Sequence, residues 1–129
     1  TTRGEMSKAI LEGVAFALKD CLEIAKTNGI FPTYSSICGG GAKSKTWKQV
    51  VADVLNIPIH VLKTNQGPSY GAAILAMVGD GIYKNVEEAT KSIIKVEEII
   101  QPSQNRIEYY QKKYELFKKL YPVLKNIRN

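Results

Sequence analysis

Histidine and cysteine are scarce in this sequence of 129 residues, which holds one histidine, His60, and two cysteines, Cys21 and Cys38. A metal site would need further ligands at suitable spacing from His60, and the sequence offers none, so we interpret His60 as an ordinary strand residue. Cys21 falls within a helical pattern and Cys38 ends an apolar, strand-like run. We therefore expect two reduced, buried thiols rather than a disulfide or a catalytic cysteine.

Long apolar runs are absent as well. No stretch reaches the roughly 18 apolar residues that a membrane-spanning helix requires. The first five residues, Thr-Thr-Arg-Gly-Glu, also lack the charged-then-apolar layout of a signal peptide. We therefore expect no membrane partner and a cytoplasmic location.

An excess of positive charge is present, with a net charge of +6 from 18 basic and 12 acidic residues. Much of the excess falls in the last third of the chain, where basic residues alternate with apolar ones at helical spacing. No aromatic-rich nucleic-acid module accompanies them, so we interpret them as a solvated helix face and expect no nucleic-acid partner. The residues concerned are Lys112, Lys113, Lys118, Lys119, Lys125 and Arg128.

The first quarter of the chain has the pattern of a long amphipathic helix. Apolar residues recur at three- and four-residue steps and predict one buried stripe. Thr2 and Glu5 have the spacing of a capping box at its start, and Asn28-Gly29 suits its end. The predicted stripe consists of Met6, Ile10, Val14, Ala17, Leu18, Cys21, Leu22 and Ala25.

Extended and helical patterns alternate over the rest of the chain. Strands are predicted over 34–38 and 59–62, and helices over 45–55, 70–78 and about 85–91. An extended stretch, 96–102, leads to a last helix that begins at Ser103, and Pro122 predicts a break or kink in it. The apolar stripe expected on this last helix consists of Ile107, Tyr110, Tyr114, Phe117, Leu120 and Tyr121.

This order is helix, strand, helix, strand, helix and a helical tail, which favours an α/β fold with parallel strands. Two clear strands are too few for such a sheet, which has about five or six strands on average and is covered on both faces. The sequence therefore predicts a piece of a larger sheet. An unpaired strand edge and an uncovered apolar face favour association, so we expect the isolated chain to self-associate.

Three successive glycines, Gly39, Gly40 and Gly41, end the first strand just before a helix. Glycines there let a ligand approach backbone N–H groups, and the start of the following helix favours an anion such as a phosphate. A tight strand-to-helix turn without a ligand would explain the glycines equally well. The run matches neither the P-loop nor the dinucleotide-binding pattern.

The segments around these glycines carry a wider resemblance. Residues 39–55, GGGAKSKTWKQVVADVL, resemble the adenosine-binding segment of the FGGY carbohydrate kinases, and the GGGAKS, WKQ and ADVL elements are most similar to those of xylulose kinases. Residues 65–76, NQGPSYGAAILA, resemble the second conserved block of that family. Further along the chain, residues 78–83 and 87–89 also match the family, and residues 9–16 are similar to the helix that precedes its glycine motif.

The resemblance implies an RNase H-like fold of the actin-like ATPase type, with residues 1–129 as the C-terminal portion of the second, nucleotide-binding kinase domain. It implies ATP and Mg²⁺ as cofactors of the intact enzyme. The loop formed by Gly39, Gly40 and Gly41 would lie against the ribose and α-phosphate. The three residues after it would flank the adenine, although Lys43 could equally be solvated; they are Ala42, Lys43 and Ser44.

The resemblance also suggests roles outside the loop. Gly71-Ala72-Ala73 matches a helix near the hinge between the two kinase domains, although close packing of a buried helix would explain the small residues as well. Trp47 and Gln49 would fix the helix that follows the glycines. Asp53 does not match the catalytic base of the family, so we expect a structural role for it.

The implied function is phosphorylation of D-xylulose to xylulose 5-phosphate by the intact enzyme, whose partners are ATP or ADP, the sugar and the remainder of the kinase chain. In the family, the catalytic aspartate lies earlier in the chain, so no residue here is predicted to be catalytic and the chain alone is predicted to be inactive. The alternatives are a gluconate, glycerol or ribulose kinase of the same family, or a non-catalytic nucleotide-binding or interaction module.

Overall fold

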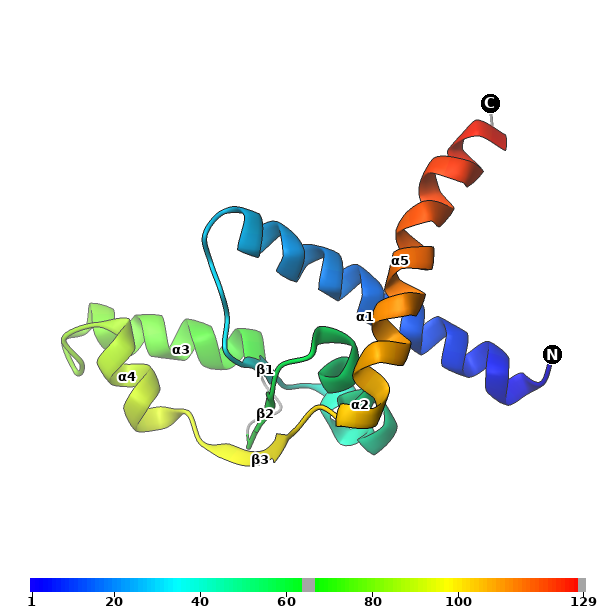
Figure 1. Ribbon diagram of the computed structural model, residues 1–129. Helices are drawn as coiled ribbons and strands as arrows, with labels where there is room; N and C mark the ends of the chain where they lie inside the picture. Colours follow the sequence, from blue (N-terminus) through cyan, green and yellow to red (C-terminus); the bar gives the residue numbers. More distant parts are fainter. Residues whose placement is uncertain (64–66, 128–129) are drawn as a thin grey trace.

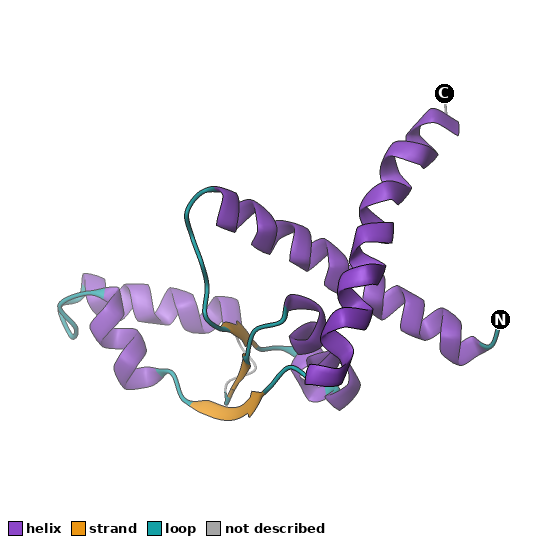
Figure 2. Cartoon of the chain, viewed as in Figure 1, coloured by secondary structure: helices purple, strands orange, loops and turns teal. Residues whose placement is uncertain are grey.

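The computed structural model describes residues 1–63 and 67–127, and Figure 1 shows how its elements are arranged. Helices make up most of the described chain, around a small sheet (Figure 2). The helices and strands, in chain order, are α1 (Arg3–Thr27), β1 (Ser35–Ile37), the 3₁₀ helix η1 (Gly40–Lys43), α2 (Lys45–Leu55), β2 (Ile59–Leu62), α3 (Gly67–Gly79), α4 (Val86–Ile93), β3 (Val96–Ile100) and α5 (Gln104–Ile127).

The sheet has the strand order β1-β2-β3. β1 and β2 are parallel, with Ser36 opposite His60, which confirms the predicted parallel pair. The stretch predicted only as extended forms a third strand, β3, and it runs antiparallel to β2 with His60 opposite Ile99. The sheet is therefore mixed, because the long connection that contains α3 and α4 brings the chain back in the opposite direction.

Both ends of α1 follow the predicted capping signals. The Thr2 hydroxyl accepts a hydrogen bond from the Glu5 N–H at 3.2 Å, and the Glu5 carboxylate accepts one from the Thr2 N–H at 2.6 Å. At the other end, Asn28 is the cap residue and Gly29 has a φ of +79°, which glycine adopts without strain. The capping box and the terminal glycine therefore fix where this helix begins and ends.

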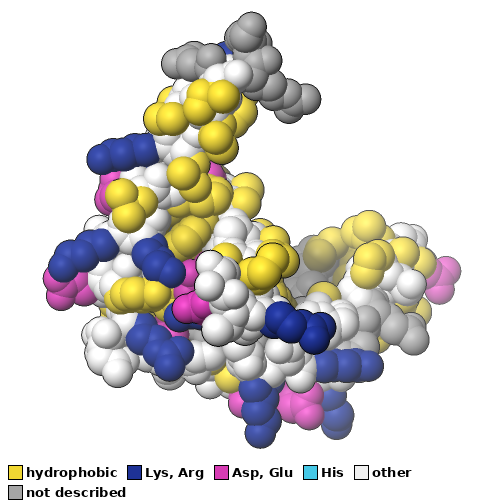
Figure 3. All heavy atoms as spheres, turned by 90° about the vertical axis from the view of Figure 1, so that its right-hand side faces the viewer, with side chains coloured by type: hydrophobic (Ala, Val, Ile, Leu, Met, Phe, Trp, Pro, Cys, Tyr) yellow, Lys and Arg dark blue, Asp and Glu magenta, His cyan; other side chains and the backbone are white. Residues whose placement is uncertain are grey.

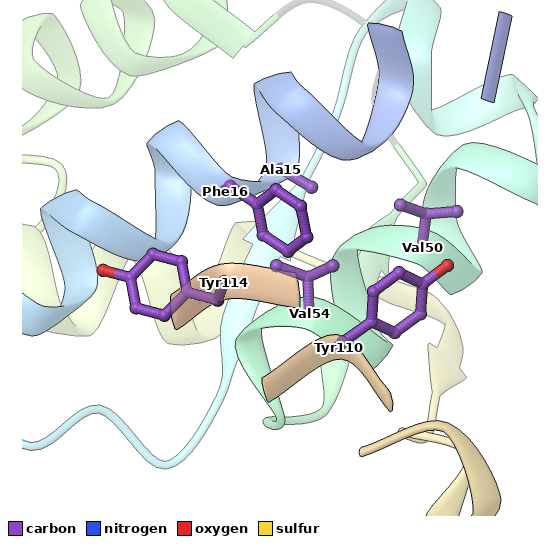
Figure 4. Close-up of a cluster of buried hydrophobic side chains, with 6 residues drawn as sticks. All are labelled: Ala15, Phe16, Val50, Val54, Tyr110 and Tyr114. Carbon is purple, nitrogen blue, oxygen red and sulfur yellow. The ribbon is translucent and has the colours of Figure 1, made fainter. Parts of the chain in front are cut away.

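The core surrounds α2, which lies between α1 and α5. Figure 4 shows one cluster, in which side chains from these three helices converge on one another; its members are Ala15, Phe16, Val50, Val54, Tyr110 and Tyr114. A second cluster joins α1 and α2 to the sheet through Leu22, Val51, Ala52, Leu55 and Ile59. Trp47 packs against both clusters, so α2 holds the two halves of the core together.

The prediction that the apolar stripe of α1 is buried is mostly wrong. The buried residues of α1 are Glu12, Ala15, Phe16 and Leu22, of which only Leu22 belongs to the stripe. Four members of the stripe are exposed large apolar residues, namely Met6, Ile10, Val14 and Leu18. The reason is that α1 carries apolar residues on two faces, and in the described chain α2 and α5 cover only one of them.

α5 also differs from its prediction. Tyr110 and Tyr114 are buried and Phe117 is partly buried, but Leu120 and Tyr121 of the predicted stripe are exposed. Figure 1 shows that α5 crosses α1 and extends beyond it, so its last turns pack against no other described helix. Of the break or kink predicted at Pro122, the break is wrong, because the helix continues to Ile127. Arg128 lies outside the described residues.

α3 and α4 pack on each other, and Figure 1 shows them as a pair set apart from α1 and α5. α3 begins at Gly67, three residues before the predicted start, while Asn65 and Gln66 of the predicted second block lie outside the described residues. Asn85 caps α4, since its side chain accepts a hydrogen bond from the Glu88 N–H at 2.9 Å. None of the helices described is long and apolar enough to cross a membrane.

The prediction for the cysteines is half right. Cys21 and Cys38 are both free thiols, as expected, but both are exposed rather than buried. Cys21 lies on the face of α1 that the other described helices leave open, and Cys38 lies between the end of β1 and the glycine turn. Position in an apolar pattern predicted burial, and the missing cover over that pattern is why the prediction was wrong.

Candidate functional site

The three glycines form a sharp turn at the carboxyl end of β1. Gly39 has a φ of +79°, a conformation that side chains rarely adopt, so glycine is required at this position. Its carbonyl accepts a hydrogen bond from the Ala42 N–H at 3.2 Å, and the Gly41 carbonyl accepts one from the Ser44 N–H at 3.1 Å. These bonds close η1, which leads directly into α2.

Gly40 and Gly41 have different surroundings. A Cβ atom on Gly41 would lie 3.0 Å from Nε1 and 3.1 Å from Cδ1 of Trp47, so the indole packs against bare backbone. A Cβ atom on Gly39 or Gly40 would meet no atom of residues 1–63 and 67–127 within 4 Å. The backbone of Gly39 and Gly40 therefore borders space that the described residues leave open, and a flat or polar ligand could come close there.

The three residues after the glycines have distinct surroundings. Ala42 is buried and Lys43 is exposed. The Ser44 hydroxyl caps α2 by accepting a hydrogen bond from the Trp47 N–H at 3.2 Å. Because the hydroxyl oxygen already accepts this hydrogen bond, the hydroxyl O–H is the group of the Ser44 side chain that could donate a hydrogen bond to a ligand.

A cavity of about 490 Å³ lies beside this turn, at the carboxyl end of β2. In α/β proteins, ligands bind outside the carboxyl ends of parallel strands, and this is such a position. Lys48 of the cavity wall pairs with Glu98. The wall consists of Ala42, Lys43, Lys45, Lys48, Val61, Leu62, Glu97 and Glu98.

Gln49 and Asp53, on α2, turn away from the glycines and hold the start of α5. The Asp53 carboxylate is 1% exposed and accepts hydrogen bonds from the Ser103 N–H at 2.7 Å and from Gln49 Nε2 at 2.8 Å. Arg106 lies 3.6 Å from the other carboxylate oxygen. Asp53 therefore has the structural role that was predicted for it, and Gln49 helps to fix α2.

The small residues of α3 lie in the first half of that helix. Gly71, Ala72 and Ala73 are exposed, and a Cβ atom on Gly71 would meet nothing within 4 Å. Close packing of a buried helix, one of the two explanations considered for them, is therefore wrong within the described chain. Participation in a hinge stays a prediction.

Two tyrosines of α5 have displaced pKa values. Burial, together with the nearby negative charge of Glu12, raises the pKa of Tyr110 to about 12. Burial and a hydrogen bond to Asp20 raise the pKa of Tyr114. Both belong to the crossing of α1 and α5, so these shifts report packing rather than chemistry at the glycine turn.

Sequence reasoning missed the residues of β3, the following loop and the start of α5 that contact α2, namely Glu98, Gln101, Ser103 and Arg106. No local signal could have found them, because 50 or more residues separate them from their partners on α2. In residues 1–63 and 67–127, no group of three or more His, Cys, Asp and Glu side chains could hold a metal ion.

Comparison with known proteins connects this geometry to a family. Residues 1–79 match the model of the C-terminal domain of the FGGY family of carbohydrate kinases. A xylulose kinase of Staphylococcus epidermidis is 35% identical over 126 residues, which is 98% of this chain and 25% of that protein. An L-fuculokinase of Haemophilus influenzae is 36% identical over 107 residues, which is 82% of this chain and 21% of that protein.

Solved structures agree with these sequence matches. A xylulose kinase from Rhodospirillum rubrum has a TM-score of 0.80 at 30% identity, covering 98% of this chain and 26% of that one. A gluconate kinase from Lactobacillus acidophilus has a TM-score of 0.83 at 27% identity, with 96% and 26% covered. Glycerol kinase from Plasmodium falciparum, solved with ADP, has a TM-score of 0.75 at 25% identity, with 95% and 24% covered. The chain thus spans about a quarter of the length of the relatives it matches.

Proposed function

The chain belongs to the FGGY family of carbohydrate kinases, and from this premise we propose that residues 1–129 form the C-terminal portion of the second, nucleotide-binding domain of a xylulose kinase. Its helices and mixed sheet are part of the actin-like ATPase fold of these kinases. The proposed intact enzyme transfers the γ-phosphoryl group of ATP to the 5-hydroxyl of D-xylulose, with Mg²⁺ and in the cytoplasm.

The glycine turn is the single observation that carries the nucleotide part of this proposal. Gly39 has a positive φ, which favours glycine at this position, and Gly39 and Gly40 border space that the described residues leave open. In the proposed complex, Gly39, Gly40 and Gly41 lie against the ribose and α-phosphate of ATP or ADP. Ala42, Lys43 and Ser44 flank the adenine. A turn without side chains at the carboxyl end of a strand suits this close approach of a nucleotide to the main chain.

The choice of xylulose rests on similarity, since several of the relatives most like this chain are xylulose kinases. The family match also includes a fuculokinase, a gluconate kinase and a glycerol kinase, so another sugar or polyol is the second candidate. The sugar is proposed to bind mainly to the remainder of the kinase. A panel assay of the intact enzyme separates these candidates, because only one sugar should give a high kcat/KM with ATP.

The proposed reaction forms a bond between the sugar oxygen and the γ-phosphorus and breaks the bond between that phosphorus and the bridging oxygen of ADP. The hydroxyl proton passes to a base, which we assign to the remainder of the enzyme because Asp53 is buried and holds Ser103 and Gln49. Mg²⁺ would neutralise charge on the transferring phosphates. The part of this chain is to hold the nucleoside end in place, so the chain alone should not turn over.

Exposed apolar surface supports the idea that other parts of the kinase cover this chain. A groove of about 560 Å³ runs between α1, β1 and α2, and Leu18, Cys21, Trp47 and Ile57 are among its lining residues. Figure 3 shows further apolar side chains along the outer half of α5. The remainder of the intact kinase is the proposed cover of these surfaces. Without it, the same surfaces would drive self-association of the chain.

Calorimetry with ADP tests the nucleotide part of the proposal. The intact kinase should bind ADP, and the isolated chain should bind it weakly or not at all, because one side of the nucleotide site is missing. Tight binding by the isolated chain would instead favour the non-catalytic nucleotide-binding module. Absence of binding by the intact kinase would contradict both.

A further inference from the structure

α2 sets the position of the glycine turn. Its N-terminal cap, Ser44, is also the residue whose N–H closes the turn on the Gly41 carbonyl at 3.1 Å. Trp47, in the first turn of α2, packs against the backbone of Gly41. Because no flexible linker separates the turn from the helix, a shift or rotation of α2 moves the main-chain atoms of the turn with it.

α2 is in turn fixed by a segment about 50 residues further along the chain. We call residues 98–106 the β3–α5 junction, since they join the end of β3 to the start of α5. Gln49 Nε2 lies 3.0 Å from the Gln101 carbonyl and 3.0 Å from the Ser103 hydroxyl, and 2.8 Å from Asp53. The Asp53 carboxylate receives the Ser103 N–H at 2.7 Å. One partly buried network therefore ties α2 to the junction.

An ion pair adds a second tie on the same side of α2. The buried ammonium of Lys48 is hydrogen-bonded to the carboxylate of Glu98, at the start of the junction. At the other end of the junction, Arg106 faces the second oxygen of Asp53. The junction thus contacts α2 at Lys48, Gln49 and Asp53. Loss of these hydrogen bonds and ion pairs would leave polar atoms of α2 without their partners, which is costly where those atoms are buried.

We propose that the β3–α5 junction positions the glycine turn for the nucleotide, with Asp53 and Gln49 as the positioning residues. The junction lies outside the 1–79 range that matches the family model, so the proposal gives the following segment a role in nucleotide binding. The inference rests on the proposed function, since it requires that the nucleotide binds at the turn. Asp53 and Gln49 touch neither the nucleotide nor the sugar in this proposal and act through α2.

The test compares Asp53→Ala with Asp53→Asn in the intact kinase that contains this chain. The alanine variant removes both hydrogen bonds to the carboxylate. The asparagine oxygen can still accept from Ser103 and Gln49, while its NH2 group replaces the charged oxygen opposite Arg106. Ala89→Gly on α4 is the matched control, because Ala89 is fully buried but far from α2 and its change lowers stability without touching the network. The readouts are the Kd for ADP, the KM for ATP, the KM for the sugar and kcat.

For Asp53→Ala we expect the Kd for ADP and the KM for ATP to rise about tenfold, within the hundredfold that a misplacement of about 1 Å can cost. The KM for the sugar should stay within about twofold, and Asp53→Asn should recover most of the loss. Unchanged nucleotide constants in a folded Asp53→Ala variant would overturn the proposal. So would an equal rise of both KM values, or the same rise in Ala89→Gly. The Kd for ADP does not depend on the sugar, so failure on xylulose would count against the proposed substrate and leave this inference standing.

Discussion

Lys113 on α5 and Glu12 on α1 form an ion pair with Nζ and Oε2 2.8 Å apart, although 101 residues separate them in the sequence. Glu12 is only 4% exposed, and its negative charge lies near the buried Tyr110 of the core. The neighbouring pair Lys112 and Glu108 lies on the same helix but is exposed. The two pairs together allow a direct measurement of what burial adds to an ion pair.

Glu12→Ala should destabilise the chain by about 1–3 kcal/mol, because it removes the charge-assisted hydrogen bond by which Lys113 joins α5 to α1. Glu108→Ala, the matched control, should give no measurable change. Urea unfolding followed by the fluorescence of Trp47, the sole tryptophan, measures both. Equal effects of the two variants would contradict the role given to Glu12.

Alkaline pH should weaken the crossing of α1 and α5. The pKa of Tyr110 is raised to about 12 and that of Tyr114 is raised as well, so both phenols are neutral in the folded chain at a pH where they would ionise after unfolding. Their contribution to stability is complete below about pH 10, the ordinary tyrosine pKa, and is lost as the pH rises towards the raised values. Unfolding measured from pH 8 to 12 should show this decline.

Tyr110→Phe should make the decline with pH shallower, since it removes one of the two phenols. Tyr121→Phe is the matched control, because Tyr121 is exposed near the end of α5 and should leave the pH profile unchanged. A profile that is equally steep in both variants would show that other groups cause the alkaline loss.

Gly40→Ala and Gly41→Ala should separate ligand binding from packing. A methyl group at Gly41 meets the Trp47 indole at 3.0 Å, so this variant should lose about 1–3 kcal/mol of stability and change the tryptophan fluorescence. A methyl group at Gly40 enters open space, so that variant should unfold like the parent but bind ADP more weakly in the intact kinase. Normal ADP binding by Gly40→Ala would argue against a nucleotide beside Gly40.

The exposed face of α1 should make the isolated chain self-associate. Ile10, at 68% exposed, and Val14 lie on that face. Light scattering should find oligomers of the parent chain and fewer of them for Ile10→Glu with Val14→Glu. Ile82→Glu, on the exposed turn after α3, is the control and should leave the oligomers in place. A monomeric parent chain at high concentration would reject this prediction.

Local signals were sufficient for parts of the fold. α2 spans the predicted residues 45–55 because Ser44 caps its start and Asn56, in the left-handed conformation, ends it. β2 covers the predicted 59–62, and the Thr2–Glu5 capping box forms as expected. Each of these features depends on residues a few positions apart, which a sequence displays directly.

Features that depend on distant residues could not be predicted in the same way. Which face of α1 is buried depends on where α2 and α5 lie, and the stripe through Ile10 and Val14 gave no sign that it would be left open. The antiparallel direction of β3 depends on how α3 and α4 return the chain. At the candidate site, the glycines marked the turn, but the partners of Asp53 in the β3–α5 junction are visible only after folding.

A crystal structure of the intact kinase with ADP tests the central claim most directly. We predict that the ribose and α-phosphate lie against the main chain of Gly39, Gly40 and Gly41, with the adenine beside Ala42, Lys43 and Ser44. An ADP molecule bound away from this turn would contradict the assignment of the nucleotide site, and the glycines would then serve only the tight connection between β1 and α2.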